Sequence, residues 1–246
     1  MTKNWFDQGG ADYAAFRPDY PPALSLALAR LSPARQRAVD VGCGAGQLTL
    51  ALADHFETVV GMDPGVNQIA HAPVRPNVSY VVAPAEATGL EAGSADLITA
   101  AQAAHWFDLP AFYAEARRIA VPGALLALIT YGAPVLDADL RDRFDRFYVD
   151  EIGPFWPPER ALVDSGYAGI DFPFPELEAP ASGIERDWSL PQLLGYVGTW
   201  SASRRAREAG RSDVLDAFAS DLAAAWGDPE RPRRITWPIR MRLGRV

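Results

Sequence analysis

The chain contains a single cysteine, Cys43, among its 246 residues. One thiol cannot build a disulfide framework, and it excludes a zinc site made of several cysteines. No run approaches about 18–20 consecutive apolar residues, so the sequence predicts no membrane-spanning helix. The first residues lack a basic region followed by an apolar one, which argues against a secretory signal. These absences predict a cytoplasmic protein with no metal site.

Lysine is nearly absent as well, because Lys3 is the only lysine among 23 basic residues. Asp and Glu number 31, so the formal net charge is −8. Residues 1–199 carry 13 basic and 25 acidic side chains, a net charge of −12, whereas residues 200–246 carry 10 and 6, a net charge of +4. A nucleic-acid partner requires a broad basic surface, so this balance disfavours one. The C-terminal arginines are either solvated or able to hold an anionic small molecule.

The composition, with 49% hydrophobic and 22% charged residues, is that of a folded domain. Apolar segments typical of buried strands alternate with helical patterns in the first half of the chain. Strands are predicted at 38–42, 58–62, 78–82, 95–99 and 124–130, and helices at 48–56, 66–72 and 110–120. Near-continuous apolar strands separated by helices indicate a mostly parallel α/β sheet, doubly wound and covered on both faces.

The pattern changes after residue 131. Helical spacing predicts helices at 133–150, 189–200 and 213–226, a proline-rich connection at 152–158, and an edge strand or loop at 172–177. Strict alternation over 235–243 predicts a final strand. We therefore expect one domain, 1–246, with an N-terminal segment (1–36), a core (37–131), a helical insertion (133–231) and a last strand (232–246).

Three glycines, Gly42, Gly44 and Gly46, form a turn between the first strand and the first helix of the core. Glycine lets the backbone turn sharply and lets a ligand approach main-chain N–H groups. Asp63 follows the second strand, 17 residues after Gly46, where an acid can accept hydrogen bonds from a ribose. The dinucleotide pattern G-x-G-x-x-G fails because its third glycine is replaced by Gln47, which disfavours a pyrophosphate ligand.

The segments 39–46 and 61–63 resemble the class I S-adenosylmethionine-dependent methyltransferases. Residues 6–21, 101–107, 200–202 and 226–227 narrow the resemblance to the trans-aconitate methyltransferase-like subgroup, which has a methyltransferase type 11 domain. The chain departs from the family at Ala124, where a second glycine is usual, and at Ala85-Glu86, where many relatives carry Asp. The resemblance implies a seven-stranded sheet with its last strand antiparallel and S-adenosylmethionine as cofactor.

The resemblance also implies a set of cofactor-binding residues. Asp63 would bind the ribose, and Asp40 would hold the methionine end or, alternatively, pin the glycine turn through main-chain N–H groups. The N-terminal segment would fold over the cofactor as a lid or pack as a helix, and Glu86 would lie near the adenine or in solvent. Cys43 is expected to be a small turn residue without catalytic function. The full set is Tyr13, Arg17, Asp40, Gly42, Cys43, Gly44, Gly46, Asp63, Pro64, Ala85, Glu86 and Gln102.

On the acceptor side, His105 could act as a general base for a hydroxyl or amine. A carboxylate acceptor needs no base, and His105 would then orient the acceptor or pack the pocket. Tryptophans would line the pocket or belong to the core, and an arginine would hold an acidic acceptor. The candidates for binding the acceptor are His105, Trp106, Trp156, Trp200 and Arg204, with Arg205 as a further arginine.

These observations predict methyl transfer to an O, N or C atom of a small molecule, with a carboxylate as the first choice. A protein that binds S-adenosylmethionine without catalysis and a nicotinamide-dependent oxidoreductase are the alternatives, and RNA methylation is disfavoured by the negative charge. We expect a monomer or a homodimer.

Overall fold

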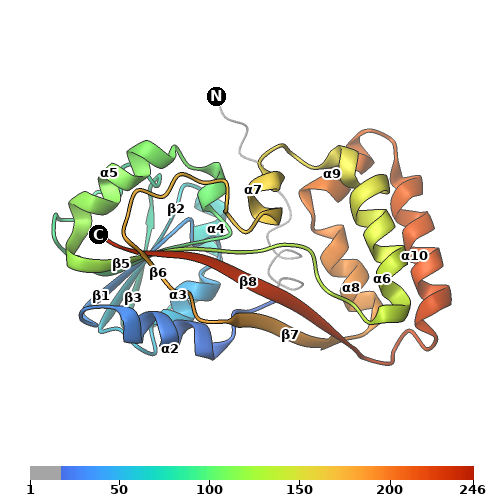
Figure 1. Ribbon diagram of the computed structural model, residues 1–246, viewed down its shortest axis with the longest axis horizontal. Helices are drawn as coiled ribbons and strands as arrows, with labels where there is room; N and C mark the ends of the chain where they lie inside the picture. Colours follow the sequence, from blue (N-terminus) through green and yellow to red (C-terminus); the bar gives the residue numbers. More distant parts are fainter. Residues whose placement is uncertain (1–17) are drawn as a thin grey trace.

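The computed structural model describes residues 18–246 as an eight-stranded sheet with helices on both faces and a group of helices at one end (Figure 1). The strands are β1 (Arg37–Val41), β2 (Thr58–Asp63), β3 (Val78–Val82), β4 (Ala95–Ala101), β5 (Ala120–Tyr131), β6 (Glu176–Leu177), β7 (Ser182–Trp188) and β8 (Arg233–Arg245). The α-helices are α2 (Pro22–Leu31), α3 (Gln47–Leu52), α4 (Val66–Ala70), α5 (Leu109–Ile119), α6 (Ala138–Arg146), α7 (Arg160–Asp164), α8 (Leu190–Gly198), α9 (Ser201–Glu208) and α10 (Ser212–Trp226). Shorter turns are η1 (Ala104–Trp106), η2 (Phe147–Glu151) and η3 (Gly153–Phe155).

The sheet has the order β3-β2-β1-β4-β5-β8-β6. The first five strands of this order, β3, β2, β1, β4 and β5, pair in parallel, whereas β8 runs antiparallel to β5. The prediction of a mostly parallel sheet with an antiparallel last strand is therefore confirmed. The chain moves from β1 outward to β3 and then returns to place β4 on the other side of β1. This reversal opens a crevice at the carboxyl ends of β1 and β4, where ligands of such sheets bind.

The number of strands differs from the expected seven because β8 is long enough to pair with different strands along its length. Its residues 239–245 pair with β5, whereas its residues 233–239 pair with β7. β7 has only Ile184 and Trp188 as large apolar residues, so no apolar pattern predicts this strand. Figure 1 shows β7 and β8 extending together from the sheet to the C-terminal helices.

Successive residues of β5 belong to two separate apolar clusters, one on each face of the sheet. Leu125 and Ile129 pack in the cluster that includes residues of α2 and α3, whereas Leu126 and Leu128 pack with residues of α5. All four side chains are fully buried. Burial on both faces explains why this strand is continuously apolar in sequence.

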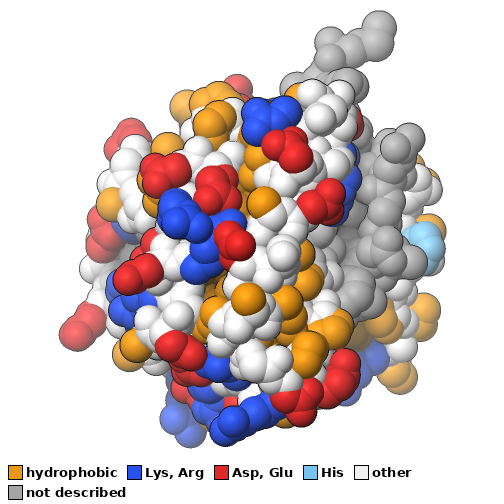
Figure 2. All heavy atoms as spheres, turned by 90° about the vertical axis from the view of Figure 1, so that its right-hand side faces the viewer, with side chains coloured by type: hydrophobic (Ala, Val, Ile, Leu, Met, Phe, Trp, Pro, Cys, Tyr) orange, Lys and Arg blue, Asp and Glu red, His pale blue; other side chains and the backbone are white. Residues whose placement is uncertain are grey.

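The helices α6, α8, α9 and α10 pack around aromatic side chains at the other end of the molecule. The rings of Phe147 and Phe218 stack with 3.8 Å between their centroids, and Trp200 packs 6.3 Å from Phe147. Figure 2 faces this end and shows basic and acidic side chains interspersed on its surface. Several C-terminal arginines are paired with carboxylates there, including Arg211 with Asp213. The positive excess of this region therefore forms no continuous basic surface on the face shown.

Tyr80 of β3 determines which residues fit in β2 and in the glycine turn. Its ring crosses Gly61, where an added Cβ would lie 2.8 Å from two ring carbons and 3.0 Å from Thr49 Oγ1. An added Cβ at Gly46 would overlap the Tyr80 hydroxyl. Both positions therefore require glycine for as long as Tyr80 keeps this place.

We expect Gly61→Ala to lower the free energy of unfolding by about 1–3 kcal/mol, because overpacking forces the Tyr80 ring or β2 to move. Gly183→Ala is the matched control, since its Cβ would meet the nearest atom, the Trp237 carbonyl oxygen, at 3.5 Å. Urea unfolding of both variants checks this. Equal stability of the two variants would contradict the clash.

Candidate active site

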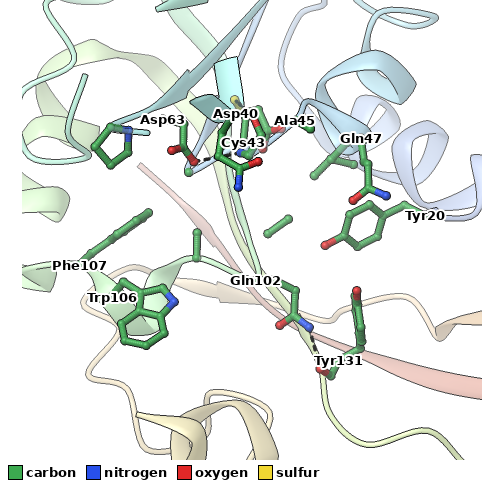
Figure 3. A pocket seen from close by; sticks show the side chains of 17 residues that line it. Tyr20, Asp40, Cys43, Ala45, Gln47, Asp63, Gln102, Trp106, Phe107 and Tyr131 are labelled. Atoms are coloured by element: carbon green, nitrogen blue, oxygen red, sulfur yellow. Dashed lines mark hydrogen bonds between the residues drawn. The ribbon is translucent and has the colours of Figure 1, made fainter. Parts of the chain in front are cut away.

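A crevice lies at the carboxyl ends of β1, β2 and β4 (Figure 3). It contains about 900 Å³ of empty space, part of it open to solvent. The glycine turn 42–45 and the pair Asp63-Pro64 form one side, and Figure 3 shows Gln102, Trp106 and Tyr131 opposite them. Of the predicted cofactor residues, the crevice brings together Asp40, Gly42, Cys43, Gly44, Asp63, Pro64 and Gln102.

The turn 42–46 is built from three left-handed glycines. Gly42, Gly44 and Gly46 have φ angles of 70°, 55° and 85°, a conformation in which other residues are strained. A Cβ at Gly42 would also overlap the side chain of Ala103 from the loop after β4. The Cys43 N–H donates to the Met62 carbonyl at 2.9 Å, which fixes the turn against β2. The turn thus requires glycine for both its backbone angles and its close packing.

Asp63 accepts main-chain hydrogen bonds with both carboxylate oxygens. The Gly44 N–H donates to Oδ2 at 3.0 Å and the Gly65 N–H donates to Oδ1 at 2.7 Å. Burial raises the pKa of Asp63, and these two N–H groups oppose that rise. Each oxygen of a carboxylate has two lone pairs, so both can accept a further hydrogen bond from the crevice.

Asp40 lies at the bottom of the crevice and is 1% exposed. The Thr49 hydroxyl donates to Oδ2 and the Thr99 hydroxyl donates to Oδ1, each at 2.7 Å. Asp40 therefore connects β1 to α3 and β4 through two side chains. Burial raises its pKa to about 6, although both hydroxyls favour the charged form.

Gln102 is held on the opposite side of the crevice. Its backbone has a φ of 55°, rare for a residue other than glycine. Its Nε2 donates to the Tyr131 carbonyl at 2.8 Å and its Oε1 accepts from the Thr130 hydroxyl at 2.7 Å. The amide is thus fixed by the end of β5, 28 to 29 residues further along the chain.

His105 lies in η1, next to Trp106 but outside the crevice lining. Its Nδ1 is 2.9 Å from the Tyr167 hydroxyl. Burial, with a smaller contribution from the charge of Arg160, lowers the pKa of His105 to about 4. The imidazole is therefore neutral at pH 7 and a weak base. This geometry favours the prediction that His105 orients or packs rather than accepts a proton.

The other predicted residues lie away from the crevice lining. Ala85 is buried, and Glu86 accepts the Asp108 N–H at 2.9 Å, which connects it to the start of α5. Gly46 begins α3. Trp200 is 3% exposed and belongs to the aromatic core, so packing explains it better than acceptor binding. The remaining three are Trp156, which packs 5.3 Å from Trp200, Arg204, which lies 4.0 Å from Glu208, and Arg205 on the same helix. Tyr13 and Arg17 lie outside the described residues.

Several residues that line the crevice were not predicted. They are Ala45, Gln47, Leu48, Gln68, Ala101, Ala103, Phe107 and Tyr131. Tyr20 also lines the crevice, and it belongs to the segment expected to fold over the cofactor. Most are neighbours of predicted residues in the glycine turn or in the loop after β4, so their position in those motifs was the available signal. In the sequence, Gln47 indicates only that the third glycine of the dinucleotide pattern is absent. Nothing in the sequence indicates that Tyr131 lines the crevice, because it is simply the last residue of an apolar strand.

Within residues 18–246, no group of three or more His, Cys, Asp or Glu side chains is placed to hold a metal ion. In the same part of the chain, no helix has the length and apolar character needed to cross a membrane.

An open α/β sheet with a glycine turn and an acid at the end of its second strand defines a class of nucleoside-binding proteins. Residues 39–128 match the family model described as a methyltransferase domain. A Dictyostelium discoideum protein named as a methyltransferase is 33% identical over 240 residues, which cover 95% of this chain and 91% of the relative. A malonyl-[acyl-carrier protein] O-methyltransferase of Geobacter sulfurreducens is 31% identical over 85% of this chain and 84% of the relative.

A solved structure described as a type II methyltransferase from Anaeromyxobacter dehalogenans is 52% identical, with a TM-score of 0.88 over 94% of this chain and 98% of that one. The chain belongs to the S-adenosylmethionine-dependent methyltransferase family. It is therefore an enzyme with S-adenosylmethionine as its cofactor.

If Asp63 binds the ribose, Asp63→Ala will weaken the binding of S-adenosylhomocysteine by roughly 1–3 kcal/mol, because hydrogen bonds to a charged group are lost. Isothermal titration calorimetry measures this. Asp54→Ala is the control, since Asp54 is exposed and pairs only with Arg75. An unchanged affinity in Asp63→Ala would contradict the ribose assignment.

Asp40 should make the ligand-free protein less stable as the pH rises from about 4 to 6. The folded protein holds the Asp40 proton up to a pKa of about 6, whereas the unfolded chain loses it near 3.8. The shift corresponds to about 3 kcal/mol. Asp40→Asn should therefore have a higher free energy of unfolding than the wild type at pH 7.5, and the difference should be much smaller at pH 4.5. Urea unfolding at the two pH values checks this, and a difference that does not change with pH would contradict it.

Proposed function

We propose that the enzyme methylates a carboxylate oxygen of a small-molecule acceptor, as the trans-aconitate methyltransferase-like resemblance suggests. The observation that carries the proposal is the lack of a general base, among the described residues, on the side of the crevice opposite the glycine turn. The two carboxylates of the crevice, Asp40 and Asp63, lie at the glycine turn, on the side expected to hold the cofactor, and burial raises the pKa of the Cys43 thiol. His105, the nearest histidine, has a pKa lowered to about 4. A hydroxyl or amine acceptor would need a base, whereas a carboxylate is already ionised at pH 7.

The crevice residues fit S-adenosylmethionine. Both oxygens of Asp63 have lone pairs left for the ribose hydroxyls, and the glycine turn permits close approach of a ligand to the main chain. The carboxylate of Asp40 is buried, and no basic side chain is among the main causes of its pKa shift. Asp40 therefore suits the cationic methionine end of the cofactor. This assignment does not require a phosphate site, in agreement with Gln47 at the third glycine position.

S-adenosylmethionine, when bound, would supply an activated methyl group on a sulfonium, whose C–S bond electrons would stay on sulfur as a carboxylate lone pair forms the new C–O bond. No proton moves in this step when the acceptor is a carboxylate. The chain has to align the two reactants and exclude water. Hydrogen bonds hold both the nitrogen and the oxygen of the Gln102 side-chain amide, so Gln102 forms a rigid part of the crevice lining next to Trp106.

The Geobacter sulfurreducens relative supports an acidic acceptor, because its name describes O-methyl transfer to a malonyl group and a malonyl group carries a carboxylate. The side-chain chemistry of the crevice and this relative thus favour the same acceptor group. The neutral, weakly basic His105 would contribute by orienting the acceptor together with Tyr167.

The experiment is a screen for product formation with purified enzyme and S-adenosylmethionine. Small di- and tricarboxylates, phenols and amines are compared by release of S-adenosylhomocysteine and by mass spectrometry of the product. We expect methyl esters of carboxylates, with kcat/KM showing no ionisation near pH 6.5 because His105 stays neutral. Methylation of phenols or amines alone would overturn the proposal, and tight cofactor binding without any product would indicate a binding protein instead.

A further inference from the structure

A cluster of polar and aromatic side chains lies around the short helix α7, which contacts the crevice region through η1. Helix α7 packs against η1, which carries His105 and Trp106, and against β5. Trp106 itself lines the crevice. Figure 1 shows α7 between the sheet and the C-terminal helices. This position is where an acceptor would meet a cofactor bound in the crevice.

Arg160, the first residue of α7, is held rigidly in this cluster. Its Nε donates to the Tyr148 hydroxyl at 2.8 Å and to Asp164 Oδ1 at 2.9 Å, and Tyr148 also donates to that oxygen at 2.7 Å. The guanidinium carbon lies 4.4 Å from the ring centroid of Trp156 and 5.5 Å from that of Tyr148. The Arg160 side chain is only 18% exposed. These contacts fix the plane of the guanidinium before any ligand arrives.

All hydrogen bonds of Arg160 to the described residues use Nε, so within residues 18–246 Nη1 and Nη2 donate to no protein group. These two nitrogens form the fork that binds a carboxylate with two parallel hydrogen bonds. The same cluster holds a second unused donor, because Trp156 Nε1 is buried without a hydrogen-bond partner in the described structure. Unpaired donors at partly buried positions are costly unless a ligand or water accepts from them.

Asp164 does not cancel the charge of Arg160 toward the crevice. It meets only Nε, shares its oxygen with Tyr148 and is 40% exposed. The positive charge of Arg160 still reaches His105, where it helps to keep the imidazole neutral. The cluster therefore presents one fixed positive charge beside a neutral histidine.

We propose that Nη1 and Nη2 of Arg160 bind an anionic carboxylate of the acceptor, distinct from the carboxylate that receives the methyl group. The inference rests on the proposed function. Two charge-assisted hydrogen bonds from a guanidinium stabilise the negative charge of a carboxylate and so lower its nucleophilicity. The anchored group and the reacting group are therefore different, and the acceptor is a small molecule with at least two carboxylates.

The test measures binding in the absence of turnover, with S-adenosylhomocysteine bound to the enzyme. The probes are trans-aconitate, which carries three carboxylates, and its neutral trimethyl ester, in calorimetric titrations of the wild type, Arg160→Gln and Arg160→Lys. We expect Arg160→Gln to bind trans-aconitate about tenfold to hundredfold more weakly, the size typical of lost charge-assisted hydrogen bonds. Its affinity for the ester should stay within about twofold of the wild type, and Arg160→Lys should retain part of the preference for the anion.

Arg234→Gln is the matched control, because Arg234 is an exposed arginine that pairs with Glu185 and Asp187 on the outside of the sheet. It should bind both probes like the wild type. Unchanged trans-aconitate binding in Arg160→Gln would overturn the inference. An equal loss for both probes would do so too, since it indicates a structural role. Absence of trans-aconitate binding to the wild type would also overturn it.

The outcomes separate this inference from the proposed function. Formation of a methyl ester by wild type and Arg160→Gln with equal kcat/KM would leave carboxylate methylation standing and overturn the role of Arg160. Binding of trans-aconitate through Arg160 without formation of any methyl ester from the carboxylate panel would leave the anion site standing and overturn the proposed function.

Discussion

The structure depends on a carboxylate buried in the first strand. Asp40 is 1% exposed, and both of its oxygens are held by threonine hydroxyls from α3 and β4. The contacts join the three elements that surround the crevice, so they determine where the strand ends lie. Two neutral hydroxyls compensate a buried negative charge only in part, and for this reason the pKa of Asp40 is raised. A cationic ligand would compensate the rest. A site that destabilises the empty protein in this way favours a positively charged cofactor over a neutral one.

The glycine turn and Asp63 are coupled to that arrangement through close packing. Gly42 lies against Ala103 from the β4 loop, and Gly46 lies beneath Tyr80 of β3. Asp63 binds Gly44 across the turn. The turn is thus enclosed by strands on both sides of the topological reversal, and a ligand meets main-chain groups that cannot move away. Rigid placement of this kind favours the alignment of donor and acceptor that methyl transfer requires.

The sequence was informative where function depends on neighbouring residues. The turn 42–46 and Asp63 are tied to strand ends, and the apolar pattern of the strands predicted both those ends and the parallel sheet. The sequence was much less informative where a site is assembled from segments that lie far apart along the chain. Arg160 meets Tyr148, Trp156 and the neighbourhood of His105, and nothing in its local sequence distinguishes it from the other arginines of a chain with one lysine. The contact of Glu86 with the Asp108 N–H, 22 residues away, likewise leaves no trace in the local sequence. β7 was missed because its pairing with β8 compensates for a weak apolar pattern of its own.

The geometry of the two sides of the crevice is therefore determined by different parts of the structure. The cofactor side consists of backbone groups and acids at the ends of adjacent parallel strands, where geometry is set by the sheet itself. The proposed acceptor side would consist of side chains carried by η1, α7 and the segment before α7, and α7 contacts the sheet at β5. Changing a residue such as Arg160 leaves the strand ends in place, whereas changing Asp40 or Gly42 alters the packing of the core. Acceptor specificity in this chain can thus vary with few substitutions in the C-terminal half, while the cofactor side stays fixed by the requirements of folding.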